Sequence, residues 1–289
     1  MHYVKAKAIL SSSNGINVYR GCTHGCIYCD ARSDCYQFSH DFEDIEVKIN
    51  APELLEDALQ RKRVKCMIST GAMSDPYMHC EEKVKLTCKC LEVIRKYGFG
   101  ATVLTKSNRI LRDLDLICSI HERARFIVQM TLTTHEDALC RILEPNVCTT
   151  EKRAEALQQF HRNGIPTIVW LTPLLPFLND TKDNLKGILD LCEEAGVEGI
   201  LCFGIGVTLR AGDRDYFYKR LDAFFPGMSK KYRDKFGNAY WIPSDRNQEL
   251  MDYFYTRCKR AKIMCSPDEI FAYISCISKN RGEQLSLFS

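Results

Sequence analysis

The chain has 289 residues, of which 45% are hydrophobic and 27% charged, and its formal net charge at pH 7 is +3. This composition is typical of a folded globular protein, and it excludes both a disordered chain and a strongly basic nucleic-acid-binding protein. No segment approaches the roughly 18 apolar residues of a membrane-spanning helix, and the first residues lack an apolar run of signal-peptide length. We therefore expect a cytoplasmic protein without a membrane partner.

In chain order, short β-branched runs alternate with longer segments of helical periodicity, which predicts repeated βα units around a parallel sheet. The expected strands span residues 16–20, 66–70, 101–105, 126–132, 167–171 and 199–203. The expected helices between them span residues 52–62, 82–96, 109–120, 150–162 and 180–195. Asn163, Gly164 and Gly196 suit the ends of the last two helices. Six such units predict an α/β fold, a partial (β/α)6 barrel.

Beyond residue 210 the sequence becomes aromatic and basic, and a further helix is expected over 246–261. We predict a barrel core over 1–210, a C-terminal helical extension over 211–278 packed on the barrel, and a flexible tail over 279–289. Segment 226–262 holds nine Lys or Arg and four Asp or Glu. The extension could bind nucleic acid through phosphates and stacked bases, or its aromatic residues could form a layer that closes the barrel.

Three cysteines follow the first expected strand in the string GCTHGCIYCD: Cys22, Cys26 and Cys29. An iron–sulfur cluster usually takes four thiolates, so a [4Fe–4S] cluster here would keep one iron open for reaction chemistry. In a chain with 16 cysteines the spacing alone does not establish a cluster. A reducing cytosol makes a disulfide framework unfavourable, and we interpret the other thirteen cysteines as core thiols. His24 is interpreted as part of the loop.

Five ordered motifs supply the context: NVYRGCTHGCIYCDAR, GAMSDPYMHCEEKVKLTCKCLEVI, VLTKSNRILRDLDLI, RILEPN and LLPFLND. Over residues 15–210 the chain resembles the radical S-adenosylmethionine (SAM) superfamily, in the subfamily related to spore photoproduct lyase, also called DNA repair photolyase-like. The resemblance implies a [4Fe–4S] cluster whose open iron binds SAM. An electron from the cluster then cleaves SAM to a 5′-deoxyadenosyl radical, so the cofactors carry the hard chemistry.

The resemblance also assigns roles to residues. Cys22, Cys26 and Cys29 match the cluster ligands. The cofactor-binding positions that match are Tyr28 near the adenine, Ser74 at the amino-acid moiety of SAM, Lys106 at its carboxylate, and Thr131 at a small hydroxyl position. A reductant such as flavodoxin or ferredoxin is implied as a partner.

One position departs from the family. Spore photoproduct lyases carry a cysteine that returns a hydrogen atom to the substrate radical, and here its place is taken by Ala72, followed by Met73. Neither side chain donates hydrogen as a thiol does, so the lyase reaction itself stays open. We expect a nucleic-acid substrate, most simply a DNA lesion in repair. The alternatives are a peptide, a modified tRNA base or a small metabolite, and a cluster-bearing clamp accessory protein without catalysis.

The C-terminal residues Gln284, Leu285, Leu287 and Phe288 belong to the string QLSLF. This string is similar to the short peptide by which bacterial replication and repair proteins bind the DNA sliding clamp. Leu and Phe anchors on a flexible tail can fill an apolar pocket on a partner. The alternative is a hydrophobic end that packs on its own domain.

Overall fold

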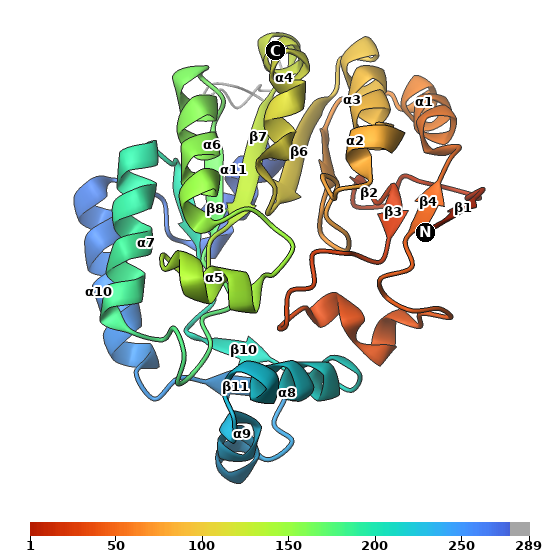
Figure 1. The fold of residues 1–289 in the computed structure, drawn as a ribbon. Helices are drawn as coiled ribbons and strands as arrows, with labels where there is room; N and C mark the ends of the chain where they lie inside the picture. The colour runs from red at the N-terminus through yellow and green to blue at the C-terminus, as the bar shows by residue number, and fades with distance from the viewer. Residues whose placement is uncertain (278–289) are drawn as a thin grey trace.

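The computed structural model describes residues 1–277, and its centre is a six-stranded parallel sheet with helices around its outer face (Figure 1). The strands follow one another in the sheet in chain order: β2 (Gly15–Ile16), β5 (Met67–Thr70), β6 (Gly100–Thr105), β7 (Phe126–Thr131), β8 (Thr167–Trp170) and β9 (Gly199–Leu201). Every neighbouring pair is parallel. This confirms the predicted fold class, a partial (β/α)6 barrel with a C-terminal helical extension.

The helices of the barrel alternate with these strands. They are α1 (Ala51–Arg61), α2 (Glu81–Val84), α3 (Leu86–Lys96), α4 (Leu114–Arg123), α5 (Asp137–Leu143), α6 (Thr150–Arg162) and α7 (Lys182–Ala195), together with the 3-10 helices η1 (Asp30–Arg32), η2 (Asp34–Tyr36) and η3 (Asn108–Asp113). Local signals fix their ends. At α7 the Thr181 side chain accepts from the Asn184 N–H at 3.1 Å, and Gly196 closes the helix at a φ of 66°.

The central strands are buried along their whole length. All six residues of β7 are buried, as are five of the six residues of β6, because helices cover one face and the barrel interior covers the other. Apolar side chains of strands and helices form one large core that runs from Ile9 to Cys258 along the chain. The carboxyl ends of the strands therefore meet around one end of the barrel interior.

Two predicted elements are wrong in detail. The strand expected over 16–20 is split, because β2 pairs with β5 while β3 (Tyr19–Arg20) joins a second sheet with β4 (Glu46–Lys48) and β1 (His2–Val4). The helix expected over 82–96 breaks at Lys85, whose φ is 53°. The buried carboxylate of Glu81 accepts from the Leu86 and Thr87 N–H groups at 3.0 and 3.1 Å and so caps α3 as a new helix.

The C-terminal extension contains α8 (Asp213–Phe224), α9 (Met228–Phe236), β11 (Trp241–Pro243), α10 (Asn247–Ala261) and α11 (Pro267–Ser275), and β11 pairs antiparallel with β10 (Gly206–Thr208) of the core. The aromatic residues of the extension divide between a buried cluster and the surface. Phe217, Tyr218 and Tyr232 are buried in a core cluster, whereas Phe224 and Trp241 are exposed. Helix α10 packs on α7, and α11 packs on β9. Within residues 1–277 no helix is long and apolar enough to cross a membrane.

Candidate active site

A cavity of about 630 Å³ lies at the carboxyl ends of the central strands. Its lining includes the residues predicted for the site within the barrel: Cys22, Cys26, Tyr28, Cys29, Ala72, Ser74, Lys106 and Thr131. These residues come from the loop after β3, the segment after β5, and the ends of β6 and β7. The structure thus brings together residues more than a hundred positions apart in the chain.

The cysteine loop is held from two sides by backbone hydrogen bonds. The Cys22 N–H donates to the Phe42 carbonyl at 3.0 Å, and the Ile27 N–H donates to the Leu143 carbonyl at 2.9 Å. Gly21 has a φ of 89°, and a Cβ there would lie 2.4 Å from the Phe42 carbonyl oxygen, so the loop can start its turn only with glycine. Burial raises the pKa of the Cys22 thiol to about 12. Iron binding must therefore be coupled to proton release from this loop.

Asp75 joins the ends of β5 and β6. Its carboxylate accepts from the Thr105 hydroxyl and from the Lys106 N–H, both at 2.7 Å, and from the Tyr77 N–H at 2.8 Å. The Nδ1 of His24 lies 3.4 Å from the same carboxylate. The His24 Nε2 is buried and has no hydrogen-bond partner among residues 1–277, although the side chain lines the cavity. Burial lowers the pKa of His24, which keeps its ring neutral.

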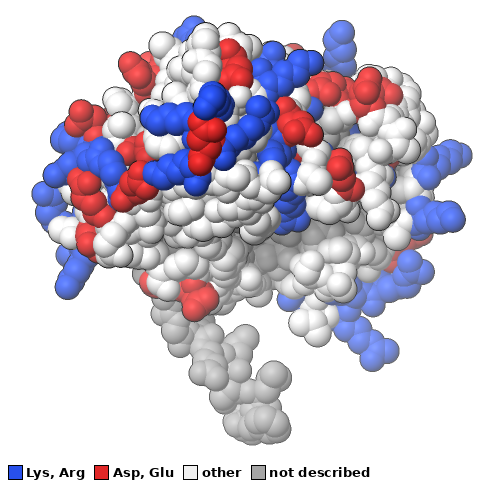
Figure 2. Space-filling view, turned by 90° about the horizontal axis from the view of Figure 1, so that it is seen from below, with Lys and Arg blue, Asp and Glu red and all other residues white. Residues whose placement is uncertain are grey.

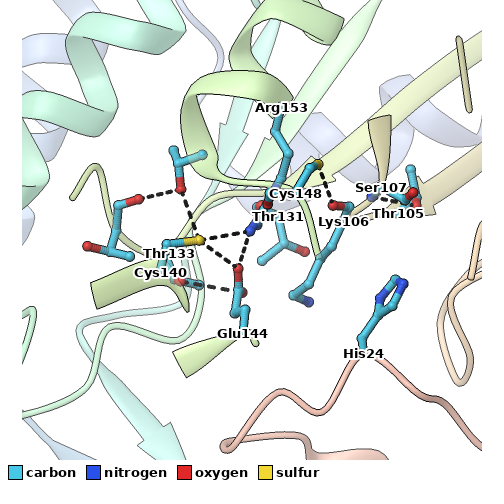
Figure 3. A network of polar contacts seen from close by, with 12 residues as sticks. His24, Thr105, Lys106, Ser107, Thr131, Thr133, Cys140, Glu144, Cys148 and Arg153 are labelled. Carbon is cyan, nitrogen blue, oxygen red and sulfur yellow. Dashed lines mark hydrogen bonds and ion pairs between the residues drawn. The ribbon is translucent and has the colours of Figure 1, made fainter. Parts of the chain in front are cut away.

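Glu144 and Arg153 form a buried ion pair close to the cysteine loop (Figure 3). Glu144 and Arg153 are completely buried and form an ion pair, and the Tyr28 hydroxyl donates to Glu144. Arg153 also donates to the Thr131 carbonyl at 2.7 Å, which ties α6 to the end of β7. Burial opposes the charge of Glu144, but Arg153 and Lys106 together lower its pKa, so the carboxylate is ionised.

Lys106 extends from the end of β6 into the space between Glu144 and His24 (Figure 3). Its Nζ lies 5.8 Å from the centre of the Tyr28 ring, within the range of a cation–π contact. Within residues 1–277 no carboxylate lies close enough to form an ion pair with Lys106. Burial disfavours its charge, but Cys26 and Glu144 raise the pKa of the amine above its usual value. A cation is therefore available to an anionic ligand in the cavity.

The remaining predicted positions also lie on the cavity wall. The Ser74 hydroxyl donates to the Tyr19 carbonyl at 3.2 Å, so its oxygen can still accept from a ligand. Thr131 is buried at the end of β7. Ala72 lines the cavity, and among the described residues no cysteine other than the three of the loop does so. Tyr36, which also lines it, has its hydroxyl 3.3 Å from Asp30.

Sequence reasoning missed two parts of the site. Glu144 belongs to a recognised motif but had no assigned role, and Arg153 was part of an expected helix. A signal existed, since Arg153 shares the inward-facing stripe of that helix with Ala156, Leu157 and Phe160. The second part is an aromatic wall formed by Trp170, Phe203 and Trp241, which also line the cavity.

The residues present fit a [4Fe–4S] cluster and SAM. The sulfur atoms of Cys22, Cys26 and Cys29 are not all within 4.8 Å of one another. Around a single tetrahedral zinc ion, with Zn–S distances of about 2.3 Å, the sulfur atoms would lie about 3.8 Å from one another. The wider spacing of the sulfur atoms here suits a cluster of several irons. The unpartnered Nε2 of His24 and the unpaired amine of Lys106 face the same cavity, where a polar anionic ligand could satisfy both.

Comparisons with known proteins agree with this geometry. A family model described as the radical SAM superfamily matches residues 16–192. An uncharacterized protein of Mycobacterium tuberculosis is 26% identical over 248 residues, which cover 82% of this chain and 71% of that protein. An uncharacterized protein of Methanocaldococcus jannaschii is 34% identical over 169 residues, or 58% of this chain and 62% of that protein.

Among solved structures, a spore photoproduct lyase mutant superimposes with a TM-score of 0.65 at 14% sequence identity, covering 91% of this chain and 79% of that chain. Another mutant of that enzyme, with bound SAM and dinucleoside spore photoproduct, gives a TM-score of 0.60 at 13% identity, covering 86% and 74% of the two chains. At this level of identity the similarity concerns the fold. It agrees with the predicted fold.

The open parallel sheet and the three-cysteine loop at its carboxyl end define an α/β protein with a candidate iron–sulfur centre. The family model covers more than half of the chain, and the chain belongs to the radical SAM superfamily. Membership implies a [4Fe–4S] cluster and SAM as cofactors, and it supports radical SAM chemistry.

Proposed function

We propose that this protein is a radical SAM enzyme that abstracts hydrogen from a nucleic-acid substrate, most simply a damaged DNA strand. The substrate class rests on one observation: the end of the barrel that carries the cavity is basic. Segment 213–236, which includes α8 and α9, holds seven Lys or Arg and four Asp. These helices lie at the bottom of Figure 1, and the view from below in Figure 2 shows Lys and Arg side chains interspersed with Asp and Glu. Such a face can neutralise phosphates beside the cavity.

In this proposal Cys22, Cys26 and Cys29 hold the cluster, and Lys106 pairs with the SAM carboxylate as a charge-assisted contact. Cluster and SAM supply a 5′-deoxyadenosyl radical when bound and reduced. Tyr28 is fixed by its hydrogen bond to Glu144, so its ring keeps one orientation in the cavity. Asp75 holds the backbone of Lys106, and Arg153 keeps Glu144 ionised beneath it.

The first test is anaerobic reconstitution with iron and sulfide, followed by addition of dithionite and SAM. We expect 5′-deoxyadenosine, detected by chromatography, and faster release when ultraviolet-damaged DNA is present. Absence of 5′-deoxyadenosine would overturn the enzymatic proposal and favour an accessory role. Release that does not respond to damaged DNA, and does respond to a peptide, tRNA or metabolite pool, would overturn only the substrate class.

The hydrogen-return step distinguishes this protein from a spore photoproduct lyase. Because Ala72 stands where that family carries its cysteine, we propose that the product radical is quenched by another donor. Carrying out the reaction in deuterated water tests this. Deuterium in the product would indicate an exchangeable donor such as a tyrosine hydroxyl, and its absence would indicate return of hydrogen from 5′-deoxyadenosine.

A further inference from the structure

The part of the cavity next to the last strands of the sheet is lined by aromatic side chains. The cysteine loop follows β3, which comes just after the edge strand β2 in the chain, whereas Trp170 ends β8 and Phe203 follows β9 at the opposite edge of the six-stranded sheet. Trp241 lies in β11, which pairs with β10 directly after this edge. All three side chains of the aromatic wall line the cavity together with the cysteines. The cavity thus spans the sheet from the cluster site to the aromatic wall.

Each ring of the aromatic wall is held in a fixed orientation. The Trp170 Nε1–H donates to the Gln129 side-chain oxygen at 2.7 Å. The Phe203 ring stacks on Phe271 of α11, with centres 6.2 Å apart and planes 25° apart. A Cβ at Gly206 would lie 2.8 Å from the Trp241 indole, so this ring packs directly against the backbone of Gly206. Fixed rings lose little conformational freedom when a ligand binds.

The rings of the wall nevertheless remain open to solvent. Phe203 is 54% exposed and Trp241 is 39% exposed, whereas Phe217, Tyr232 and Phe254 of the extension are buried. Aromatic surface that is fixed and exposed within a cavity is typical of ligand recognition. A planar ligand group can stack there without displacing any side chain.

We propose that the aromatic wall stacks a base of the substrate strand and so positions the strand relative to the cysteine loop. This inference rests on the proposed nucleic-acid substrate. The basic helix α9 comes just before β11, the strand that carries Trp241, so groups that can bind phosphates lie close in the chain to the wall. Stacking accepts any base, because every base has a flat π face. Selectivity for a lesion would then arise because damaged bases unstack from their neighbours in the strand more easily than normal bases.

The two tryptophans of the chain make the wall directly observable. The sequence contains only Trp170 and Trp241, and both line the cavity, so intrinsic tryptophan fluorescence reports on this site alone. The probe is a fluorescein-labelled 12-nucleotide oligothymidylate, titrated into the cluster-loaded protein without reductant. We expect saturable quenching of the tryptophan emission and a parallel rise in fluorescein anisotropy. An abasic strand of equal length keeps the phosphates, so it should bind more weakly and quench little.

Substitutions sharpen the test. Trp241→Ala should weaken oligothymidylate binding by about 5- to 150-fold, the range that stacking of one base supplies, while Trp241→Phe should retain most of the affinity. The control is Tyr255→Ala on α10, an aromatic side chain that is 44% exposed and does not line the cavity. Its affinity should equal that of the unmodified protein.

Equal binding of the abasic and normal strands, or unchanged affinity in both Trp241→Ala and Phe203→Ala, would overturn the inference. Quenching by an aromatic peptide and not by the oligonucleotide would do so as well. Because binding is measured without reductant, failure of SAM cleavage leaves this result intact. The inference and the proposed function can therefore fail separately.

Discussion

The two sides of the cavity are built differently. Around the cysteine loop, Tyr28, Glu144 and Arg153 are buried and hydrogen-bonded to one another, so this side has one arrangement. On the aromatic wall, Phe203 and Trp241 are fixed by packing yet open to solvent. Radical chemistry needs a defined, water-poor site, whereas a substrate must enter and leave. Under the proposed function, cofactor binding and substrate binding are therefore separate structural tasks, and each can be perturbed alone.

The largest effect should come from the cysteine loop itself. Replacing Cys26 by Ala leaves two thiolates, too few to hold the cluster, so the brown absorbance of the reconstituted protein should disappear. Replacing Cys66, which lies outside the cavity, should leave that absorbance unchanged. A cluster retained in Cys26→Ala at full iron content would refute the ligand assignment.

The buried ion pair should matter next. Arg153→Met leaves the Glu144 carboxylate buried without its partner and should reduce the free energy of unfolding by about 3–5 kcal/mol. The matched control is Arg141→Ala, which removes a surface pair with Asp137 from a side chain that is 66% exposed. That change should cost less than about 1 kcal/mol. Urea titration measures both, and equal losses would contradict the role of the buried pair.

Substitution of Lys106 tests SAM binding while the cluster is retained. Lys106→Met removes the cation that faces the cavity and should weaken SAM binding by about 10- to 100-fold, the range of a hydrogen bond to a charged group. Isothermal titration of SAM into the cluster-loaded variant measures this change. The cluster absorbance serves as the control. Undiminished affinity would exclude a contact between this amine and SAM.

A pH effect is expected away from the cofactors, in the extension. Burial raises the pKa of Asp213 from 3.8 to about 6. A carboxyl group with a higher pKa in the folded state holds its proton more tightly there, so it favours folding at low pH. Its contribution should be lost as the pH rises from about 4 to about 6, at a cost of about 1–2 kcal/mol. Asp213→Asn should remove this decline in thermal melts, and an unchanged pH profile would contradict it.

The smallest effect on catalysis should follow removal of the tail. Gln284, Leu285, Leu287 and Phe288 lie outside the described residues, and their binding to a DNA sliding clamp remains a prediction. Deleting residues 284–289 should abolish clamp binding in a pull-down assay and leave 5′-deoxyadenosine formation unchanged. Clamp binding that survives the deletion would exclude the tail as the docking element.

Local patterns in the sequence were sufficient for much of the fold and for part of the site. Alternating apolar runs predicted the six strands, and Thr181 and Gly196 end α7 through contacts within a few residues. The three cysteines and their neighbouring motifs predicted the cluster site and family. They did not predict the break at Lys85, because its cause is the side chain of Glu81, which reaches across to the next helix.

The tertiary structure alone decided what surrounds these residues. Glu144 contacts Tyr28 across 116 positions of the chain, and the aromatic wall combines residues from β8, the segment after β9, and β11. The sequence by itself determined the cysteine loop and the order of the strands, because spacing and periodicity are local properties. Burial, pairing of charges and the openness of a cavity depend on which distant segments come together, and only folding settles that.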